Sequence, residues 1–97
     1  MATSKEYMEY ILDQLCDIDG ITSKPMMGEY LLYLDSLLFG GVYDNRFLVK
    51  KTKTNEKYNM PDAIPYEGAK AMYMAEDTDD RELLTDIIRD TCAGLKK

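Results

Sequence analysis

The stretch EYLLYLDSLLFGGVYDNRFLVKK, residues 29–51, decides the fold of this chain. It contains three apolar runs rich in Leu, Tyr, Phe and Val, separated by the pairs Asp35-Ser36 and Asp44-Asn45. Spacers of two residues join antiparallel strands, and Asp and Asn tolerate the positive φ that tight hairpin turns need. The stretch therefore predicts three successive antiparallel strands, over residues 29–34, 37–43 and 46–51.

Segments on both sides extend this sheet. Residues 21–27 predict a preceding strand, in which Pro25 indicates a sheet edge or a bulge because proline has no N–H to donate. After the hairpins, the polar residues 52–60 predict a short helix ended by Pro61. Residues 62–70 predict a loop with room for a short strand, and the alternating residues 71–75 predict the last strand.

Amphipathic helices are predicted at both ends of the chain. Apolar residues recur at helical spacing over residues 4–18, and again after an acidic entry at residues 76–82. Helices commonly begin at a capping box and end at glycine. The expected boundary residues are Thr3 with Glu6 and Gly20 for the first helix, and Asp79 with Glu82 and Gly94 for the second.

Together these elements predict a single α+β domain over residues 1–97. An antiparallel meander needs one face covered, and two terminal amphipathic helices can cover it. The expected fold is a two-layer sandwich, with about five strands in the antiparallel sheet and both terminal helices packed on it.

Composition excludes several classes of function. The chain has no histidine, so it lacks the usual general base of enzymes near neutral pH. Its net charge of −6 disfavours strong binding to nucleic acid or anionic membranes. No apolar stretch predicts a membrane span, and the start MATSKEYMEY does not resemble a signal peptide. Cys16 and Cys92 fall on apolar sides of the predicted helices, as reduced thiols of a cytoplasmic protein do; a disulfide between neighbouring helices is the alternative.

No motif predicts catalysis, a metal or a cofactor. The acidic run at residues 76–82 lacks the glycine and spacing of a calcium loop, and helix capping explains it. Gly40-Gly41 lacks the spacing of a phosphate loop and indicates a bulge or a close approach by another group. Cys16 lies near a helix C-terminus beside Asp17, where a thiol is not activated. We therefore expect a protein that is not an enzyme.

Several short motifs of the sheet region are shared with a known family. They are Met26-Met27-Gly28-Glu29-Tyr30, Phe39-Gly40-Gly41-Val42-Tyr43, the hairpin with Asp44, Arg46 and Val49-Lys50, the pair Pro65-Tyr66, and Tyr73 before the acidic helix start. Over nearly its whole length the chain resembles the N-terminal domain of the TfoX (Sxy) competence regulators, as a stand-alone single-domain member. Met27 stands where that family has phenylalanine.

The resemblance implies both a fold and a role. It implies a secretion-chaperone-like sandwich and the regulation of competence genes or transcription through protein contacts with a transcription activator. The residues matched as structural motif are Met27, Gly28, Phe39, Gly40, Gly41 and Tyr66.

A protein-binding surface is the functional site that we expect. Eight tyrosines and seven methionines exceed what a small core needs, and both residue types suit protein interfaces, including that of a homodimer. Residues 46–57 also carry five basic side chains against one acidic side chain. The candidate partner-binding residues are Tyr30, Tyr33, Tyr43, Arg46, Lys50, Lys51 and Lys53. Weak nucleic-acid binding by the 46–57 basic stretch is the alternative, and a small enzyme using carboxylates is a third.

Overall fold

Three consecutive hairpins form the centre of the computed structural model, which describes residues 3–96. They join β1 (Ile21–Met26), β2 (Glu29–Leu34), β3 (Leu37–Tyr43) and β4 (Arg46–Val49). Each turn has two residues with positive φ: Met27 and Gly28, then Asp35 and Ser36, then Asp44 and Asn45. This is the turn geometry whose twist matches that of paired strands. The predicted hairpins are confirmed, with Met27 in the first turn and not in a strand.

The sheet is antiparallel and has six strands, in the order β1-β2-β3-β4-β6-β5. β6 (Met72–Met74) pairs with β4, and β5 (Asp62–Ala63) pairs with β6. Pro25 lies in the edge strand β1, as its missing N–H requires. The sixth strand is the two-residue β5, within the predicted loop. Lys50 and Lys51 lie beyond the end of β4, which is shorter than predicted.

A bulge in β3 places Phe39 in the core. The register with β2 shifts between Leu32, opposite Gly40, and Tyr33, opposite Leu38, so Phe39 is the extra residue. Cβ atoms at Gly40 and Gly41 would overlap the Leu48 and Tyr30 carbonyl oxygens, respectively. The two glycines therefore let neighbouring backbone approach closely.

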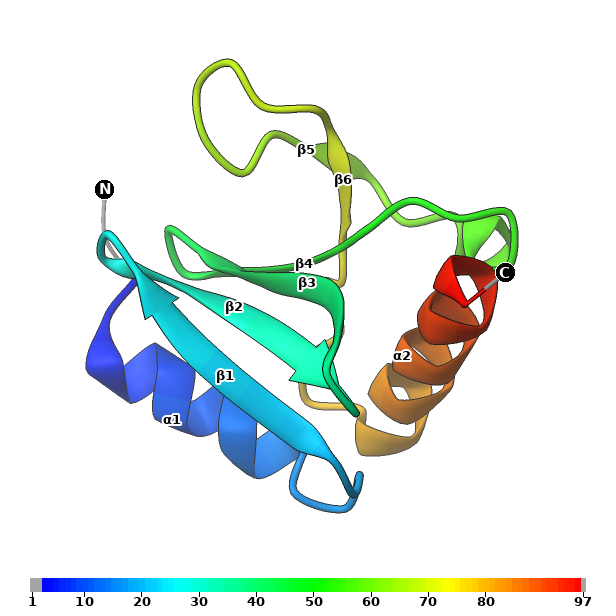
Figure 1. The fold of residues 1–97 in the computed structure, drawn as a ribbon, viewed down its shortest axis with the longest axis horizontal. Helices are drawn as coiled ribbons and strands as arrows, with labels where there is room; N and C mark the ends of the chain where they lie inside the picture. The colour runs from blue at the N-terminus through cyan, green and yellow to red at the C-terminus, as the bar shows by residue number, and fades with distance from the viewer. Residues whose placement is uncertain (1–2, 97) are drawn as a thin grey trace.

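Both helices, α1 (Lys5–Gln14) and α2 (Arg81–Leu95), cover the same face of the sheet (Figure 1). Their buried residues join those of the strands in one cluster, which defines the helix-covered face. The cluster comprises Met8, Ile11, Leu15, Ile18, Leu32, Phe39, Val42, Phe47, Val49, Ala75, Leu84, Ile87, Ile88 and Cys92. The predicted α+β sandwich is confirmed. No helix within residues 3–96 is long and apolar enough to cross a membrane.

The first helix begins one residue later than predicted and ends earlier. Ser4, not Thr3, is the N-cap and accepts a hydrogen bond from the Tyr7 backbone N–H. Thr3 instead donates its hydroxyl to Glu29 at 2.7 Å, which anchors it to the end of the sheet. The helix ends at Gln14, and turns lead to Gly20, whose carbonyl accepts from the Asp35 N–H. The capping box and the stop at Gly20 were therefore wrong.

The second helix and the middle segment also differ from prediction. Asp80, not Asp79, caps α2 by accepting from the Leu83 N–H at 3.1 Å. The helix runs through Gly94 to Leu95, so Gly94 does not end it. A Cβ at Gly94 would overlap Thr54, and the glycine therefore permits close packing there. The short helix of residues 52–60 is one 3₁₀ turn, η1 (Glu56–Tyr58), which left-handed Asn59 ends before Pro61.

A groove on the uncovered face of the sheet

The face of the sheet opposite the helices carries a second apolar surface. Antiparallel partners share a face, so Leu31 and Leu48, both opposite Gly41, project away from the helices, while Tyr30, Val42 and Phe47 project toward them. Leu48 is fully buried yet lies outside the main core cluster. We call this side the helix-free face.

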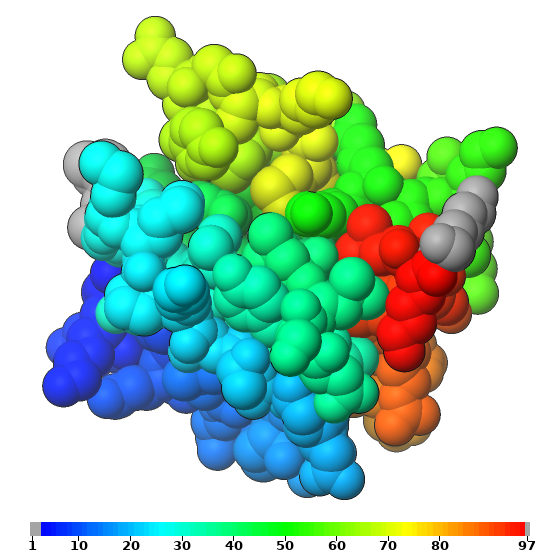
Figure 2. Space-filling model, viewed as in Figure 1, coloured from blue at the N-terminus to red at the C-terminus, as the bar shows by residue number. Residues whose placement is uncertain are grey.

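The overhanging loop, residues 64–71, turns part of this face into a groove of about 690 Å³. In the space-filling view the loop, in yellow-green, rises above the cyan and green strands (Figure 2). The sheet contributes Met26, Leu31, Leu38, Gly40 and Tyr43 to the lining, and Lys50 and Lys51 follow from the end of β4. The loop and the start of β6 contribute Pro65, Tyr66, Ala69, Lys70, Ala71 and Met72.

Two cations hold the overhanging loop and the preceding strand β5 in place. Arg46 donates from Nε to the Tyr43 carbonyl at 3.2 Å and from Nη2 to the Ile64 carbonyl at 2.9 Å. Lys51 forms an ion pair with Asp62 at 2.7 Å and lies over the Tyr73 ring. Both cations therefore act in the molecule's own structure: Asp62 neutralises the charge of Lys51, and Arg46 uses two of its donors for backbone carbonyls.

Two aromatic rings form one wall of the groove. Tyr43 is only 5% exposed, and its ring occupies the space that a side chain at Gly41 would need. Tyr66, 57% exposed, tilts toward it at 6.2 Å between ring centroids. Burial, and then the neighbouring Tyr66, raise the pKa of Tyr43. Tyr43 is thus a neutral wall residue, and Tyr66 is the ring accessible from outside.

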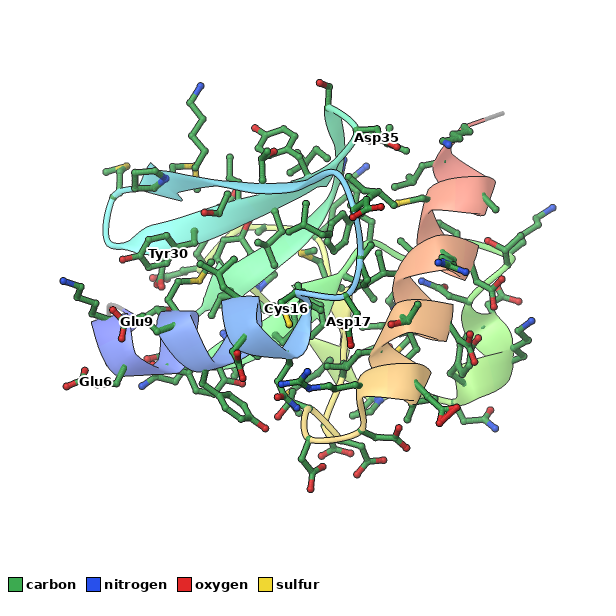
Figure 3. The ribbon with its side chains drawn as sticks, turned by 90° about the horizontal axis from the view of Figure 1, so that it is seen from below. Glu6, Glu9, Cys16, Asp17, Tyr30 and Asp35 are labelled. Carbon is green, nitrogen blue, oxygen red and sulfur yellow. The ribbon has the colours of Figure 1, made fainter. Side chains whose placement is uncertain are left out.

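The structure brings together only some of the candidate partner-binding residues. Tyr43 and Lys50 line the groove, with Arg46 and Lys51 as its braces. Tyr30 is half-buried between the sheet and α1 (Figure 3).

The remaining candidates lie outside the groove. Tyr33 lies on the helix-free face next to Thr22 and Lys24. Lys53 is exposed in the segment after β4. Among the matched motif residues, Met27 is 98% exposed at the tip of the first hairpin.

Most of the apolar lining, including Leu31, Leu38 and Met72, was not among the residues predicted from the sequence. A signal was present, because the residues of 29–34 after Glu29 are all Leu or Tyr and leave no polar face. Strands that are apolar on both faces are buried or bound on both faces. Lys70 and the overhanging loop had no comparable signal, since their position depends on the hydrogen bonds of Arg46.

The helix layer, formed by α1 and α2, differs from the apolar groove because charged side chains connect its elements. Arg81, at the start of α2, pairs with Asp13 of α1 at 3.0 Å and with Asp17, in the turns after α1, at 3.7 Å, and it contacts exposed Cys16. Cys92 is buried, burial raises its pKa, and both cysteines are free. Within residues 3–96, no group of three or more His, Cys, Asp or Glu side chains is arranged to hold a metal ion.

These features define a small α+β domain with one helix-covered face and one grooved face. No family model and no solved structure matches the chain. It is similar to a protein of Spirochaeta aurantia described as an uncharacterized 12.7 kDa protein in the trpE 5′ region. The two are 34% identical over 98 aligned positions, which cover 98% of this chain and 85% of the relative. The chain belongs to the same family as that spirochaete protein.

Proposed function

We propose that this protein is a non-enzymatic interaction domain that binds a partner protein through the groove on its helix-free face. The observation that carries the proposal is the apolar lining of that groove, with Leu31, Leu38 and Met72 half-buried and Tyr66 exposed. Accessible apolar surface of this kind marks binding sites, and a tyrosine with a free edge suits a protein interface.

A regulatory role in the cytoplasm is part of this proposal. The resemblance to TfoX N-terminal domains supports regulation of competence or transcription through contact with an activator. The two free cysteines agree with a reducing compartment. A homodimer is the second partner to consider, and light scattering of the purified protein tests it.

Nucleic-acid binding receives less support from the same geometry. Of the basic stretch, Arg46 and Lys51 are committed to Ile64 and Asp62, and Lys57 pairs with Asp90 at 3.1 Å. Binding to phosphates needs several free cations on one surface. Lys50 and Lys53 alone supply little of that requirement.

Site-specific photo-crosslinking tests the proposal. A photoreactive p-benzoylphenylalanine replaces Tyr66 on the groove wall or, as the matched control, Tyr10, which is 38% exposed on α1. In cells of the native host we expect a discrete protein adduct at position 66 and none at position 10, and the adduct should form again from purified components. Equal labelling at both positions, or no protein adduct at 66, contradicts the proposal. A nucleic-acid adduct at 66 supports the alternative.

A further inference from the structure

The charged residues that line the groove are all basic, whereas the chain as a whole has a net charge of −6. Three lysines line it, Lys50, Lys51 and Lys70, and its lining contains no Asp or Glu. Lys51 is neutralised by Asp62. Lys50 and Lys70 have no ion-pair partner among the described residues, so the apolar lining carries two free positive charges. A ligand complementary to this surface combines apolar groups with carboxylates.

A second copy of the chain does not supply that complement in a closed dimer. Two grooves meeting about a twofold axis would bring the same lysines of both copies together, and like charges at an interface cost free energy. The acidic helix layer of another copy would complement the lysines, but this head-to-tail contact makes rings or open filaments and not a twofold dimer, which is the commonest assembly. The distribution of charge therefore favours a different chain as the occupant.

We propose, resting on the function above, that the occupant is an acidic peptide segment of a partner protein with apolar side chains among its carboxylates. Its apolar side chains pack on Leu31, Leu38 and Met72, beneath the ring of Tyr66. Its carboxylates pair with Lys50 and Lys70 at the rim. Half-buried Lys50 is the stronger anchor, because charge pairs that exclude water gain more than exposed ones.

Synthetic peptides test this chemistry without the natural partner. The probes are three fluorescein-labelled twelve-residue peptides, built from Glu and Leu, from Glu and Ser, and from Lys and Leu. We expect the Glu/Leu peptide alone to bind and to shift the amide resonances of Leu31, Leu38, Ala69 and Met72. Its affinity should fall as salt rises, because the lysine contacts are screened.

Charge reversals assign the contacts. Lys50→Glu should weaken binding of the Glu/Leu peptide by about tenfold, as expected for loss of a close charge pair, and Lys70→Glu, at an exposed lysine, should weaken it by less. Lys53→Glu, an equal change at an exposed lysine outside the groove, should leave the affinity unchanged. Circular dichroism of each variant verifies that the fold is retained.

Several outcomes overturn the inference. They are absence of binding at millimolar Glu/Leu peptide, equal binding of the Lys/Leu peptide, resonance shifts confined to the helix layer, and an equal effect of Lys53→Glu. Saturation of the groove by decanoate with no peptide binding would indicate a small amphipathic acid as the ligand. A protein adduct at position 66 whose crosslinked segment is basic contradicts the acidic peptide while leaving the interaction domain intact.

Discussion

At the scale of single residues, the pair Tyr58 and Asp90 couples stability to pH. The Tyr58 hydroxyl donates to Asp90 Oδ2 at 2.6 Å, and Lys57 lies 3.1 Å from the same oxygen. Burial, and then this hydrogen bond, raise the pKa of Tyr58 from 10.0 to about 12. The hydrogen bond from Tyr58, followed by Lys57, lowers the pKa of Asp90 below 3.8.

The hydrogen-bonded pair should stabilise the fold most at pH values between the pKa of Asp90 and the pKa of Tyr58, and less at lower or higher pH. The Asp90 contribution is present above pH 3.8 and is lost as the pH falls through the lowered value; the Tyr58 contribution is present below pH 10.0 and is lost as the pH rises toward 12. We expect Tyr58→Phe to lower the free energy of unfolding by about 1–2 kcal/mol at pH 7, with a smaller loss at pH 3 and pH 11. Urea denaturation at the three pH values measures this.

Tyr66→Phe is the matched control for the hydroxyl. Tyr66 is 57% exposed and forms no side-chain hydrogen bond with the described residues, so its replacement should change stability by only a few tenths of a kcal/mol. A Tyr58→Phe variant equally destabilised at pH 3, 7 and 11 would show that the pair does not carry the pH dependence.

At the scale of secondary-structure elements, neighbouring aspartates at the start of α2 differ in role. Asp80 accepts the Leu83 N–H, whereas Asp79 precedes the cap and is exposed. Asp80→Ala should cost about 1 kcal/mol of unfolding free energy, because it leaves a helix N–H without its partner. Asp79→Ala, the matched control, should change it by a few tenths. Thermal and urea unfolding at 0.15 M salt decide the matter, and equal losses in both variants would refute the assignment.

The same helix ends show what the sequence could predict. The strands, the turns and the amphipathic stripes follow from local patterns, and they were predicted within a few residues. The caps were each misplaced by one residue, because Thr3 and Ser4, and Asp79 and Asp80, are chemically equivalent neighbours. Only the contact of Thr3 with Glu29, distant in sequence, separates the first pair.

At the scale of the whole molecule, the groove depends on contacts that no local pattern encodes. The tyrosines and the basic stretch pointed to a surface that includes Tyr43 and Lys50, and both line the groove. The sequence did not reveal that Arg46 and Lys51 brace the overhanging loop, since their partners Ile64 and Asp62 lie 18 and 11 residues away. Lysines that bind a ligand and lysines that hold a loop have the same sequence pattern.

The separation of charge between the layers leads to a prediction for salt. Residues 3–20 and 76–96 carry twelve of the 18 acidic side chains and only four of the twelve basic ones. At 10 mM salt the screening length is about 30 Å, and repulsion acts across the helix layer; at 0.15 M it is about 8 Å. We expect added NaCl to raise the free energy of unfolding by about 0.5–1 kcal/mol, the sum of a few relieved like-charge pairs.

Urea unfolding at 10 and 150 mM NaCl measures this effect, because urea carries no charge of its own. Asp79→Asn removes one charge from the acidic start of α2 without touching the cap, and it should reduce the gain from salt. Glu67→Gln removes an exposed charge from the overhanging loop, away from the helices, and it should leave the gain unchanged. Salt screens attractions between opposite charges as well as repulsions. A stability that falls with salt would therefore mean that ion pairs such as Arg81 with Asp13 outweigh the repulsion.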